Sequence, residues 1–435
     1  MKRKIYREIL KWKNSDMTKP LMIIGSRQIG KTYIIEEFCK NEFENYIEVN
    51  LQKYPNIVKI FEEKKNPEEK FYKMLIELNK SFNVETDIIF FDEVQESEQL
   101  ISDLKFFCES EKPYKIIVAG SLLGVKLNRF HSSFPVGKVE MINMYAMDFE
   151  EFLIALDKKM WIDEIKRCYE QNEPIVIHDK LLDLYRTYLY IGGMPESINS
   201  YINGQENIFN YKEKIKKNII DAYISDMSKY IENIFEGAKI EQIYKSIPSQ
   251  LGNRSKKFQY AKINKNARSR DYELPLDWLL ASNMVMKCTN LTAIEIPPKA
   301  FENPDYFKLF INDVGLLSTL LEIKFNDILL NKPYIFKGEI AENYVAQQFI
   351  SNNITLQYYK IDQKNNENME IDFILYNDDG IIPVEVKADD NTKSNSLKKY
   401  INRYNPEYAI RISSKNFGFE NKIKSVPLYA TFLIK

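Results

Sequence analysis

The feature that most constrains this chain is a glycine-bounded loop that follows a short apolar run. Leu21–Ile24 is typical of a buried parallel strand, and a helix is expected to begin at Lys31. The glycines permit a tight turn whose N–H groups face phosphates, and the helix N-terminus adds a positive dipole end. We predict that the loop binds ATP, with Lys31 on the β- and γ-phosphates and the Thr32 hydroxyl on Mg²⁺. The residues that fit the pattern G-x-x-x-x-G-K-[ST] are Gly25, Ser26, Arg27, Gln28, Ile29, Gly30, Lys31 and Thr32.

Two adjacent carboxylates supply the second half of such a site. Asp92 and Glu93 directly follow the apolar residues 88–91, and ligands bind at the carboxyl ends of strands in open α/β sheets. We expect Asp92 to hold Mg²⁺ through water and Glu93 to act as the catalytic group that polarises the attacking water.

Ser121 ends the next apolar run, residues 116–119. Its hydroxyl either senses the γ-phosphate or caps the helix that follows. A further strand is expected over residues 46–50, and charged helical stretches separate all these runs. Strands that alternate with helices predict a parallel sheet, hence an α/β fold of the P-loop NTPase kind.

Composition excludes several other classes of protein. The four cysteines form no CxxC pair and only two histidines occur, which argues against a disulfide framework and against His-rich metal sites. No apolar run approaches the ~18 residues that a membrane span needs, and we predict no membrane partner. The N-terminus lacks the apolar core of a secretory signal, so we expect a cytoplasmic protein. The net charge of −1 means that any DNA contact must come from a local patch.

Motifs spread over nearly the whole chain carry a family resemblance. They lie at residues 25–32, 91–95 (FDEVQ), 119–121 (AGS), 147–152 (MDFEEF), 192–196 (GGMPE), 308–317 (KLFINDVGLL) and 338–343 (GEIAEN). Together they resemble the bacterial and archaeal AAA-type P-loop ATPases that carry domain-of-unknown-function family 4143 after the ATPase.

The resemblance also implies a homo-oligomer, because AAA-type ATPases often place a basic finger on the nucleotide of a neighbouring subunit. The candidates for that finger are Arg27, Arg129, Lys138 and Arg186. Lys138 stands where many relatives have arginine, and an ammonium does not replace a planar guanidinium on phosphate.

Changes in composition along the chain predict four parts. Residues 1–155 form the ATPase domain, and residues 156–235 form a helical lid or linker. Residues 236–330 resemble a winged helix, with a wing near residues 286–296. Residues 331–435 form an α/β domain similar to restriction endonucleases, with a helix over 339–350 and strands near 356–361, 371–376 and 381–387.

A basic stretch lies in the third part. Residues 245–270 hold eight basic side chains and no acidic one. The stretch is either a DNA contact with salt-dependent affinity or a solvated basic face that docks on an acidic neighbour. The candidate DNA-binding residues are Arg254, Lys256, Lys257, Arg268 and Arg270.

A hairpin in the last part would bring acidic side chains together. Residues 377–380 predict a turn, and symmetric pairing about it places Asp372 opposite Glu385 and Glu370 opposite Lys387. Directly opposite side chains have Cβ atoms ~5 Å apart, a distance at which two carboxylates can share one Mg²⁺.

Asp372 with Glu385 and Lys387 resembles the D…E-x-K arrangement of restriction-endonuclease-like folds, and Glu342 matches their extra acidic residue. The resemblance implies Mg²⁺ on Glu342, Asp372 and Glu385, with Lys387 orienting the nucleophile. We therefore expect an ATPase that couples nucleotide state to a DNA-binding, metal-dependent nuclease domain. The alternative is an ATP-dependent switch whose nuclease-like domain is inactive and binds DNA or a protein partner.

Overall fold

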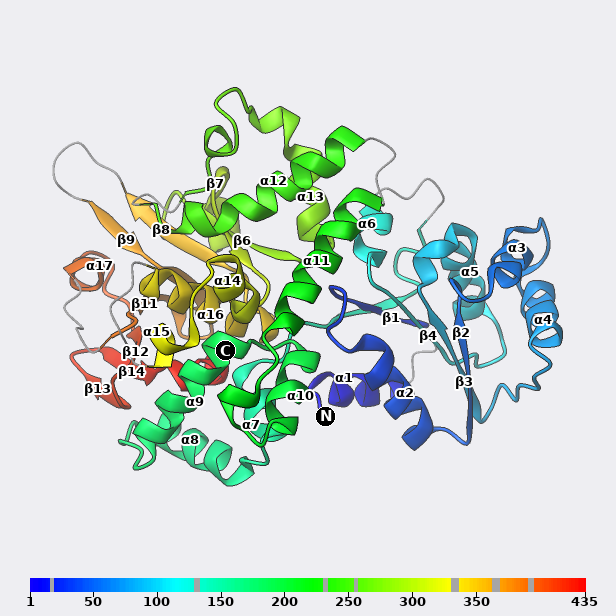
Figure 1. The fold of residues 1–435 in the computed structure, drawn as a ribbon, viewed down its shortest axis with the longest axis horizontal. Coiled ribbons are helices and arrows are strands. Elements are labelled where there is room, and N and C mark those ends of the chain that lie inside the picture. Colours follow the sequence, from blue (N-terminus) through cyan, green and yellow to red (C-terminus); the bar gives the residue numbers. More distant parts are fainter. Residues whose placement is uncertain are drawn as a thin grey trace. The chain divides into compact units, whose positions relative to one another are not determined.

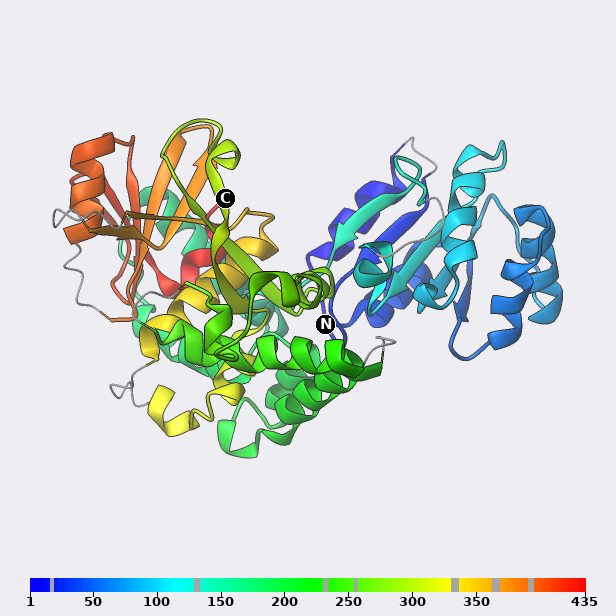
Figure 2. The same cartoon turned by 90° about the horizontal axis from the view of Figure 1, so that it is seen from above.

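The structure is a computed structural model that describes residues 1–15, 19–128, 134–229, 234–253, 257–329, 336–361, 368–389 and 395–435. The chain divides into two compact units (Figures 1 and 2). The first unit comprises Met1–Tyr145 with Ala281–Asn283, and the second comprises Ala146–Leu280 with Met284–Lys435. Among the described residues, no helix is both long enough and apolar enough to cross a bilayer.

The first unit is built on a parallel sheet of five strands in the order β2-β3-β4-β1-β5. The strands are β1 (Leu21–Ile24), β2 (Asn45–Asn50), β3 (Asp87–Asp92), β4 (Ile116–Gly120) and β5 (Glu140–Asn143). The sequence predicted the first four. It missed β5, because this four-residue edge strand has no fully buried side chain to mark it. In this order, β4 lies between the P-loop strand β1 and the strand that ends at Asp92.

The helices of the first unit bury apolar side chains that recur at helical spacing. In α1, for example, Ile5, Ile9 and Trp12 are buried and lie on one face. The phenylalanines Phe61 and Phe91 meet edge to face in the core, with ring centroids 5.8 Å apart. The helical elements are α1 (Ile5–Lys13), α2 (Lys31–Glu42), α3 (Pro55–Glu62), α4 (Pro67–Glu77), η1 (Val94–Glu96), α5 (Glu98–Glu109) and α6 (Leu123–Asn128).

The second unit begins with helices, as its sequence predicted. A capping box starts α7, in which Asp148 accepts the N–H of Glu151 at 2.9 Å. These helices are α7 (Phe149–Ala155), α8 (Lys159–Gln171), α9 (His178–Ile191), α10 (Pro195–Asn203), η2 (Ile208–Asn210), α11 (Lys214–Lys229), α12 (Ile234–Leu251), η3 (Tyr260–Lys262), η4 (Ser269–Asp271) and α13 (Glu273–Ala281).

Two sheets complete the second unit. A four-stranded sheet has the order β7-β6-β8-β9, and a five-stranded sheet has the order β10-β11-β12-β14-β13. The strands are β6 (Val285–Leu291), β7 (Glu302–Ile311), β8 (Gln357–Ile361), β9 (Met369–Ile371), β10 (Phe373–Asn377), β11 (Gly380–Val386), β12 (Ala409–Ser413), β13 (Gly418–Glu420) and β14 (Ile423–Pro427). The remaining helical elements are η5 (Pro298–Phe301), α14 (Val314–Leu320), α15 (Phe325–Leu329), α16 (Lys337–Ser351), α17 (Asn395–Tyr404) and η6 (Leu428–Leu433).

The wing expected near residues 286–296 is not a separate hairpin. Strand β6 pairs antiparallel with β7, but its other edge pairs in parallel with β8, so it is an inner strand of a larger sheet. The partner strand is far away in the sequence, and local pattern carries no signal for such pairing. Between α12 and α13 the chain forms the two short turns η3 and η4.

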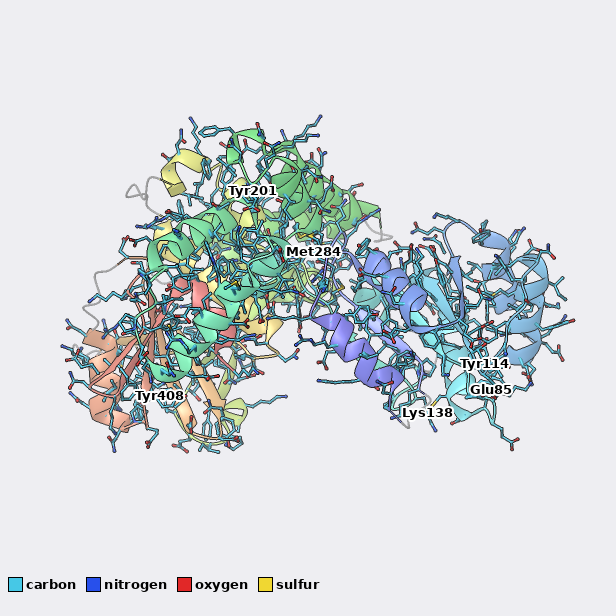
Figure 3. All side chains as sticks on the ribbon, turned by 90° about the horizontal axis from the view of Figure 1, so that it is seen from below. Glu85, Tyr114, Lys138, Tyr201, Met284 and Tyr408 are labelled. Carbon is cyan, nitrogen blue, oxygen red and sulfur yellow. The ribbon has the colours of Figure 1, made fainter. Side chains whose placement is uncertain are left out.

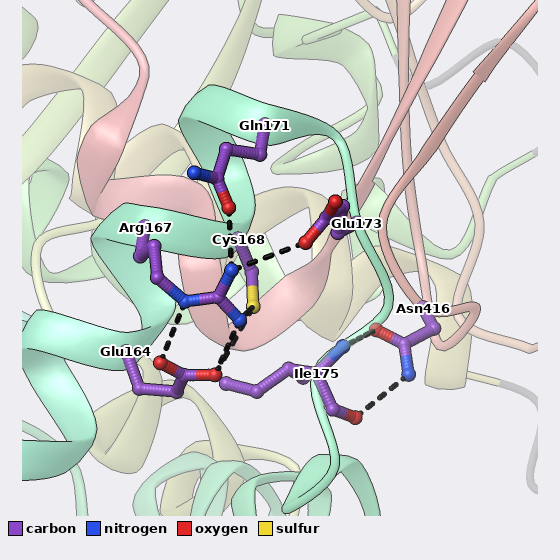
Figure 4. A network of polar contacts seen from close by, with 7 residues as sticks. All are labelled: Glu164, Arg167, Cys168, Gln171, Glu173, Ile175 and Asn416. Carbon is purple, nitrogen blue, oxygen red and sulfur yellow. Dashed lines mark hydrogen bonds and ion pairs between the residues drawn. The ribbon is translucent and has the colours of Figure 1, made fainter.

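Contacts over long sequence separations join the helical part of the second unit to its C-terminal sheet (Figure 4). The backbone of Ile175, just after α8, exchanges two hydrogen bonds with the side-chain amide of Asn416, at 2.9 and 3.0 Å. Nearby, Arg167 bridges Glu164 and Glu173 at 2.7 and 3.1 Å. These contacts fix the end of α8 beside the turn that precedes β13.

Several of the motifs that carry the family resemblance meet in a buried polar network. Asp313 accepts the N–H of Gly193 at 2.5 Å and that of Leu316 at 3.0 Å. Gln347 of α16 accepts the N–H of Val314 and donates to the hydroxyl of Tyr188, each at 2.9 Å. All these groups are buried, so the motifs serve the packing of the second unit.

Candidate functional site

The P-loop joins β1 to α2 and has the backbone that its glycines permit. Gly30 has φ of 89°, a left-handed conformation that favours glycine, and Gln28 also has a positive φ of 65°. The ammonium of Lys31 donates to the carbonyls of Gly25 and Ser26, both at 2.8 Å. Burial lowers the pKa of Lys31 to about 8, and the nearby Glu93 and Asp92 oppose that shift. The lysine therefore lies in the loop with its ammonium bonded to loop carbonyls that a phosphate can replace.

Thr32 and Asp92 lie together beneath the loop. The Asp92 Oδ2 atom accepts hydrogen bonds from the Thr32 hydroxyl and from the Asn50 amide, both at 3.2 Å. Burial raises the pKa of Asp92, and the charge of Glu93 raises it further. A hydroxyl and a carboxylate in contact are hard oxygen ligands, so these residues fit Mg²⁺.

Glu93 lies at the end of β3 with φ of 52°, outside the strand conformation. Its Oε2 atom accepts hydrogen bonds from the Gln95 amide at 2.6 Å and from the N–H and hydroxyl of Ser121, both at 3.3 Å. Ser121 reaches Glu93 because it follows β4, the strand next to β3. The structure thus brings the sequence-predicted Lys31, Asp92, Glu93 and Ser121 together.

Two further side chains at this edge of the sheet were not predicted as site residues from the sequence. Asn50 is the last residue of β2 and holds Asp92, and Gln95 lies two residues after Glu93 and holds it. The position of Asn50 at a strand end was a usable signal, because the carboxyl ends of parallel strands meet at one edge. Gln95 was also marked, because it is the last residue of the motif FDEVQ at residues 91–95.

The candidates for a basic finger have different surroundings. Lys138, labelled in Figure 3, forms an ion pair with Glu109 at 2.9 Å. Arg186 pairs with Asp183 at 2.7 Å, one helical turn earlier. Arg129 lies outside the described residues.

The predicted hairpin register in the second unit is confirmed. Phe373 lies opposite Val384, and Asn377 lies opposite Gly380. Asp372 comes just before this ladder, and its Oδ2 atom accepts the N–H of Val386 at 2.8 Å. The aspartate is therefore fixed at the end of β11, beside Glu385.

The prediction that Glu370 lies opposite Lys387 is wrong. The chain leaves one sheet and enters the next at Asp372, so Glu370 belongs to β9 and lies opposite Lys360 of β8. Glu370 forms ion pairs with Lys360 at 3.0 Å and with Lys308 at 3.1 Å. Burial alone would raise the pKa of Glu370, but the two lysines outweigh it and lower that pKa.

Lys387 instead pairs with Glu385. Their side chains are 2.5 Å apart, and the second oxygen of Glu385, Oε2, is buried without a hydrogen-bond partner in the described part of the chain. Burial alone would lower the pKa of Lys387, but the charges of Glu385, Asp372 and Glu342 raise it. The four residues of the predicted nuclease-like site therefore act on one another electrostatically.

Lys308, the first residue of the motif at 308–317, is a fully buried cation that was not predicted as a site residue. Its ammonium lies 3.1 Å from Glu370 and 3.7 Å from Glu342, and 4.6 Å from the ring centre of Tyr358. The signal was a lysine in the middle of an apolar strand, because lysine is almost never fully buried without a partner. It supplies a positive charge beside the carboxylates of this site.

A divalent metal would have few ligands here. Within the described ranges, no group of three or more His, Cys, Asp or Glu side chains is arranged to hold an ion. The unpartnered oxygen of Glu385, next to Asp372, is nevertheless the kind of donor that Mg²⁺ takes. Two of the residues present, Asp372 and Glu385, therefore fit a metal ion by the chemistry of their oxygens.

The basic stretch lies in the loops between α12 and β6. The ammonium of Lys257 lies 3.1 Å from the ring centre of Tyr306. Arg268 and Arg270 are exposed, and Arg270 is 3.6 Å from Asp271. The other two candidates, Arg254 and Lys256, lie outside the described residues.

Comparison with protein families places these sites in separate domains. Residues 17–153 match the model of an AAA domain. The N-terminal part of the chain is an AAA-type P-loop domain. Residues 182–327 match a domain of unknown function (DUF8612), and residues 337–431 match another (DUF4143). The AAA domain contains Lys31, Asp92 and Glu93, and the DUF4143 domain contains Asp372 and Glu385.

Solved structures similar to this chain include a Walker-type ATPase of Pyrococcus abyssi. It is 15% identical and the match covers 74% of this chain and 96% of that one, with a TM-score of 0.45. The ORC2 protein of Aeropyrum pernix, solved as ADPNP–ADP complexes, is 12% identical; the match covers 75% of this chain and 92% of that one, with a TM-score of 0.40. No curated protein matches the chain in sequence.

Proposed function

We propose that the protein binds ATP in the P-loop and hydrolyses it. The observation that supports this most directly is the constellation at the carboxyl edge of the first sheet. There, Thr32 contacts Asp92, and Ser121 contacts Glu93. Lys31 lies in the same loop, within the electrostatic reach of both carboxylates.

The roles follow from the chemistry of these groups. Lys31 exchanges its loop carbonyls for the β- and γ-phosphates, and loop N–H groups bind the phosphate oxygens. Thr32 and Asp92 would hold Mg²⁺, which would neutralise phosphate charge. Glu93 orients the attacking water, while Gln95 and Ser121 position its carboxylate.

The test is phosphate release from ATP, together with nucleotide binding measured by calorimetry. Lys31→Ala should abolish binding, and Glu93→Gln should keep binding and lower kcat by about 100-fold or more. Lys40→Ala removes a surface lysine from the same helix, where it pairs with Glu36, and should change neither quantity. Normal turnover in Glu93→Gln would overturn the proposed role of this residue.

We further propose that the C-terminal domain, residues 331–435, acts on DNA and cleaves it with a divalent metal. The unpartnered Glu385 oxygen and its neighbour Lys387 support this choice. Asp372 and Glu385, with Glu342 nearby, would hold Mg²⁺, which supplies an activated water and charge neutralisation when bound. Lys387 would hold and orient the nucleophile.

The basic stretch would add salt-dependent affinity for the DNA backbone. Its candidate residues are Lys257, Arg268 and Arg270, with Arg254 and Lys256.

One observation favours the alternative, an ATP-dependent switch with an inactive nuclease-like domain. Lys308 and Lys387 already place two positive charges against Glu342, Glu370 and Glu385, which weakens attraction for a metal ion. Cleavage of supercoiled plasmid with Mg²⁺ or Mn²⁺, with and without ATP, distinguishes the two functions. Loss of cleavage in Glu385→Ala, but not in the exposed Glu407→Ala, would establish the nuclease. A change in cleavage in Lys31→Ala would show that ATP controls it. No cleavage with intact ATP turnover would establish the switch.

A further inference from the structure

A cavity of about 310 Å³ opens between α17 and the five-stranded sheet of the second unit. Two isoleucines form its apolar part, and the rest of its lining is polar. Lys398 and Asn402 come from α17, Arg411 from β12 and Ser425 from β14, while Glu420 and Asn421 close the side at β13.

The cavity gathers donors that the protein itself does not use. The side chains of Lys398, Asn402, Arg411 and Ser425 form no hydrogen bond or ion pair within the described part of the chain. The Nε atom of Arg411 is buried and has no partner there. A buried donor without a partner is unfavourable, so this guanidinium favours a ligand that accepts hydrogen bonds.

The register of the sheet connects this cavity to the nuclease-like site. Glu385 lies opposite Arg411, and Arg411 lies opposite Ser425. Side chains paired in this way share one face, with Cβ atoms ~5 Å apart. Burial lowers the pKa of Arg411, and the charges of Glu385 and Glu420 oppose that shift. The arginine is thus the direct neighbour of a carboxylate of the nuclease-like site.

The chemistry of the lining fits a phosphate group. A guanidinium binds phosphate through two parallel N–H groups, and amides and hydroxyls are frequent phosphate partners. Two cations, Lys398 and Arg411, against one carboxylate, Glu420, leave the lining with a single positive charge. That charge matches a phosphodiester, which carries one negative charge, better than a doubly charged terminal phosphate.

We propose that this cavity binds a phosphodiester of a nucleic-acid strand that passes the Asp372–Glu385 pair. The choice of a strand, rather than a free nucleotide, rests on the function proposed for the C-terminal domain. The affinity for phosphate rests only on the cavity.

The test is fluorescence anisotropy of a labelled single-stranded DNA and of its duplex, at several salt concentrations. The full chain is used with Lys31→Ala, so that the P-loop takes no phosphate, and with EDTA, so that cleavage plays no part. Arg411→Gln should weaken binding about tenfold and reduce the slope of log K against log salt by about 1. Lys398→Gln should act in the same direction. Lys399→Gln removes the adjacent charge on the same helix, outside the cavity, and is the matched control.

Equal affinities and salt slopes for Arg411→Gln, Lys398→Gln and Lys399→Gln would overturn the proposal. A second arm adds thymidine monophosphate or inorganic phosphate as competitor. Weak competition supports the strand, and competition as strong as that of unlabelled DNA would overturn it in favour of a free phosphate monoester. If Arg411→Gln does not fold, the exposed Lys398→Gln decides.

Plasmid cleavage separates this inference from the proposed function. Reduced DNA binding in Arg411→Gln, with no cleavage by the wild type, would support the cavity and overturn the nuclease. Cleavage by the wild type, with DNA binding unchanged in the cavity variants, would support the nuclease and overturn the proposal for the cavity.

Discussion

Replacing Lys308 with methionine should destabilise the second unit by about 3–5 kcal/mol, because it leaves buried carboxylates without their counter-charge. The ammonium lies 3.1 Å from Glu370 and 3.7 Å from Glu342. At an effective dielectric constant of about 20, these distances correspond to roughly 5 and 4.5 kcal/mol of gross attraction. The desolvation of the buried charges offsets most of that attraction. When the lysine is removed, the two carboxylates stay buried, and their desolvation is no longer compensated.

Tryptophan fluorescence in urea measures this loss. Trp161 and Trp278 belong to the second unit, so a Trp12→Phe background reports that unit alone. With a slope of about 3 kcal/mol per molar urea, the midpoint should fall by about 1–1.7 M.

Lys360→Met is the matched control, because Lys360 pairs with the same Glu370 at 3.0 Å from a partly exposed position. Its cost should stay below about 1 kcal/mol. A midpoint for Lys308→Met no lower than that for Lys360→Met would refute the reasoning.

The stability loss in Lys308→Met should depend on pH. The folded-state pKa of Glu370 is lowered, so its stabilising contribution is complete above its unfolded pKa of about 4.3 and is lost as the pH falls through the folded value. The difference in unfolding free energy between wild type and Lys308→Met should therefore narrow below about pH 4.3. A difference that widens in acid would contradict the charge-pairing argument.

Three further variants test other parts of the structure. In Gly120→Ala the new Cβ would lie 2.0 Å from the side-chain oxygen of Gln95, which positions Glu93. ATP turnover should therefore fall about ten- to a hundredfold, with nucleotide affinity unchanged. An unaltered kcat would contradict this. Asp313→Asn turns an amide donor towards the N–H of Gly193 or Leu316 and should cost about 1–3 kcal/mol in thermal unfolding, whereas an unchanged melting temperature would argue against the network. Burial lowers the pKa of Lys216 to about 8. Between about pH 8 and 10.4 the unfolded chain therefore binds more protons than the folded chain. The free energy of unfolding should rise with pH in that range, by at most about 1.4 kcal/mol per pH unit. Urea titrations should show that the free energy of unfolding rises with pH in the wild type but not in Lys216→Met. The same rise in both proteins would refute the role of Lys216.

The sequence alone predicted the residues of the proposed ATP site. The P-loop and the Asp92–Glu93 pair are local: each is a strand with the residues directly after it, and short-range pattern fixes both. The hairpin register was also within reach, because the two-residue turn after Asn377 sets the pairing of its flanking strands.

Tertiary structure decided what lies next to what. It placed β4 between the strands of Lys31 and Asp92, and so brought Ser121 to Glu93. It moved Glu370 into another sheet and put Lys308 beside it. It also aligned Arg411 with Glu385, two residues with no relation in local pattern. The physical reason is the same in each case: strand pairing and charge pairing between distant segments depend on how the whole core packs, and period and propensity report only on near neighbours in the chain.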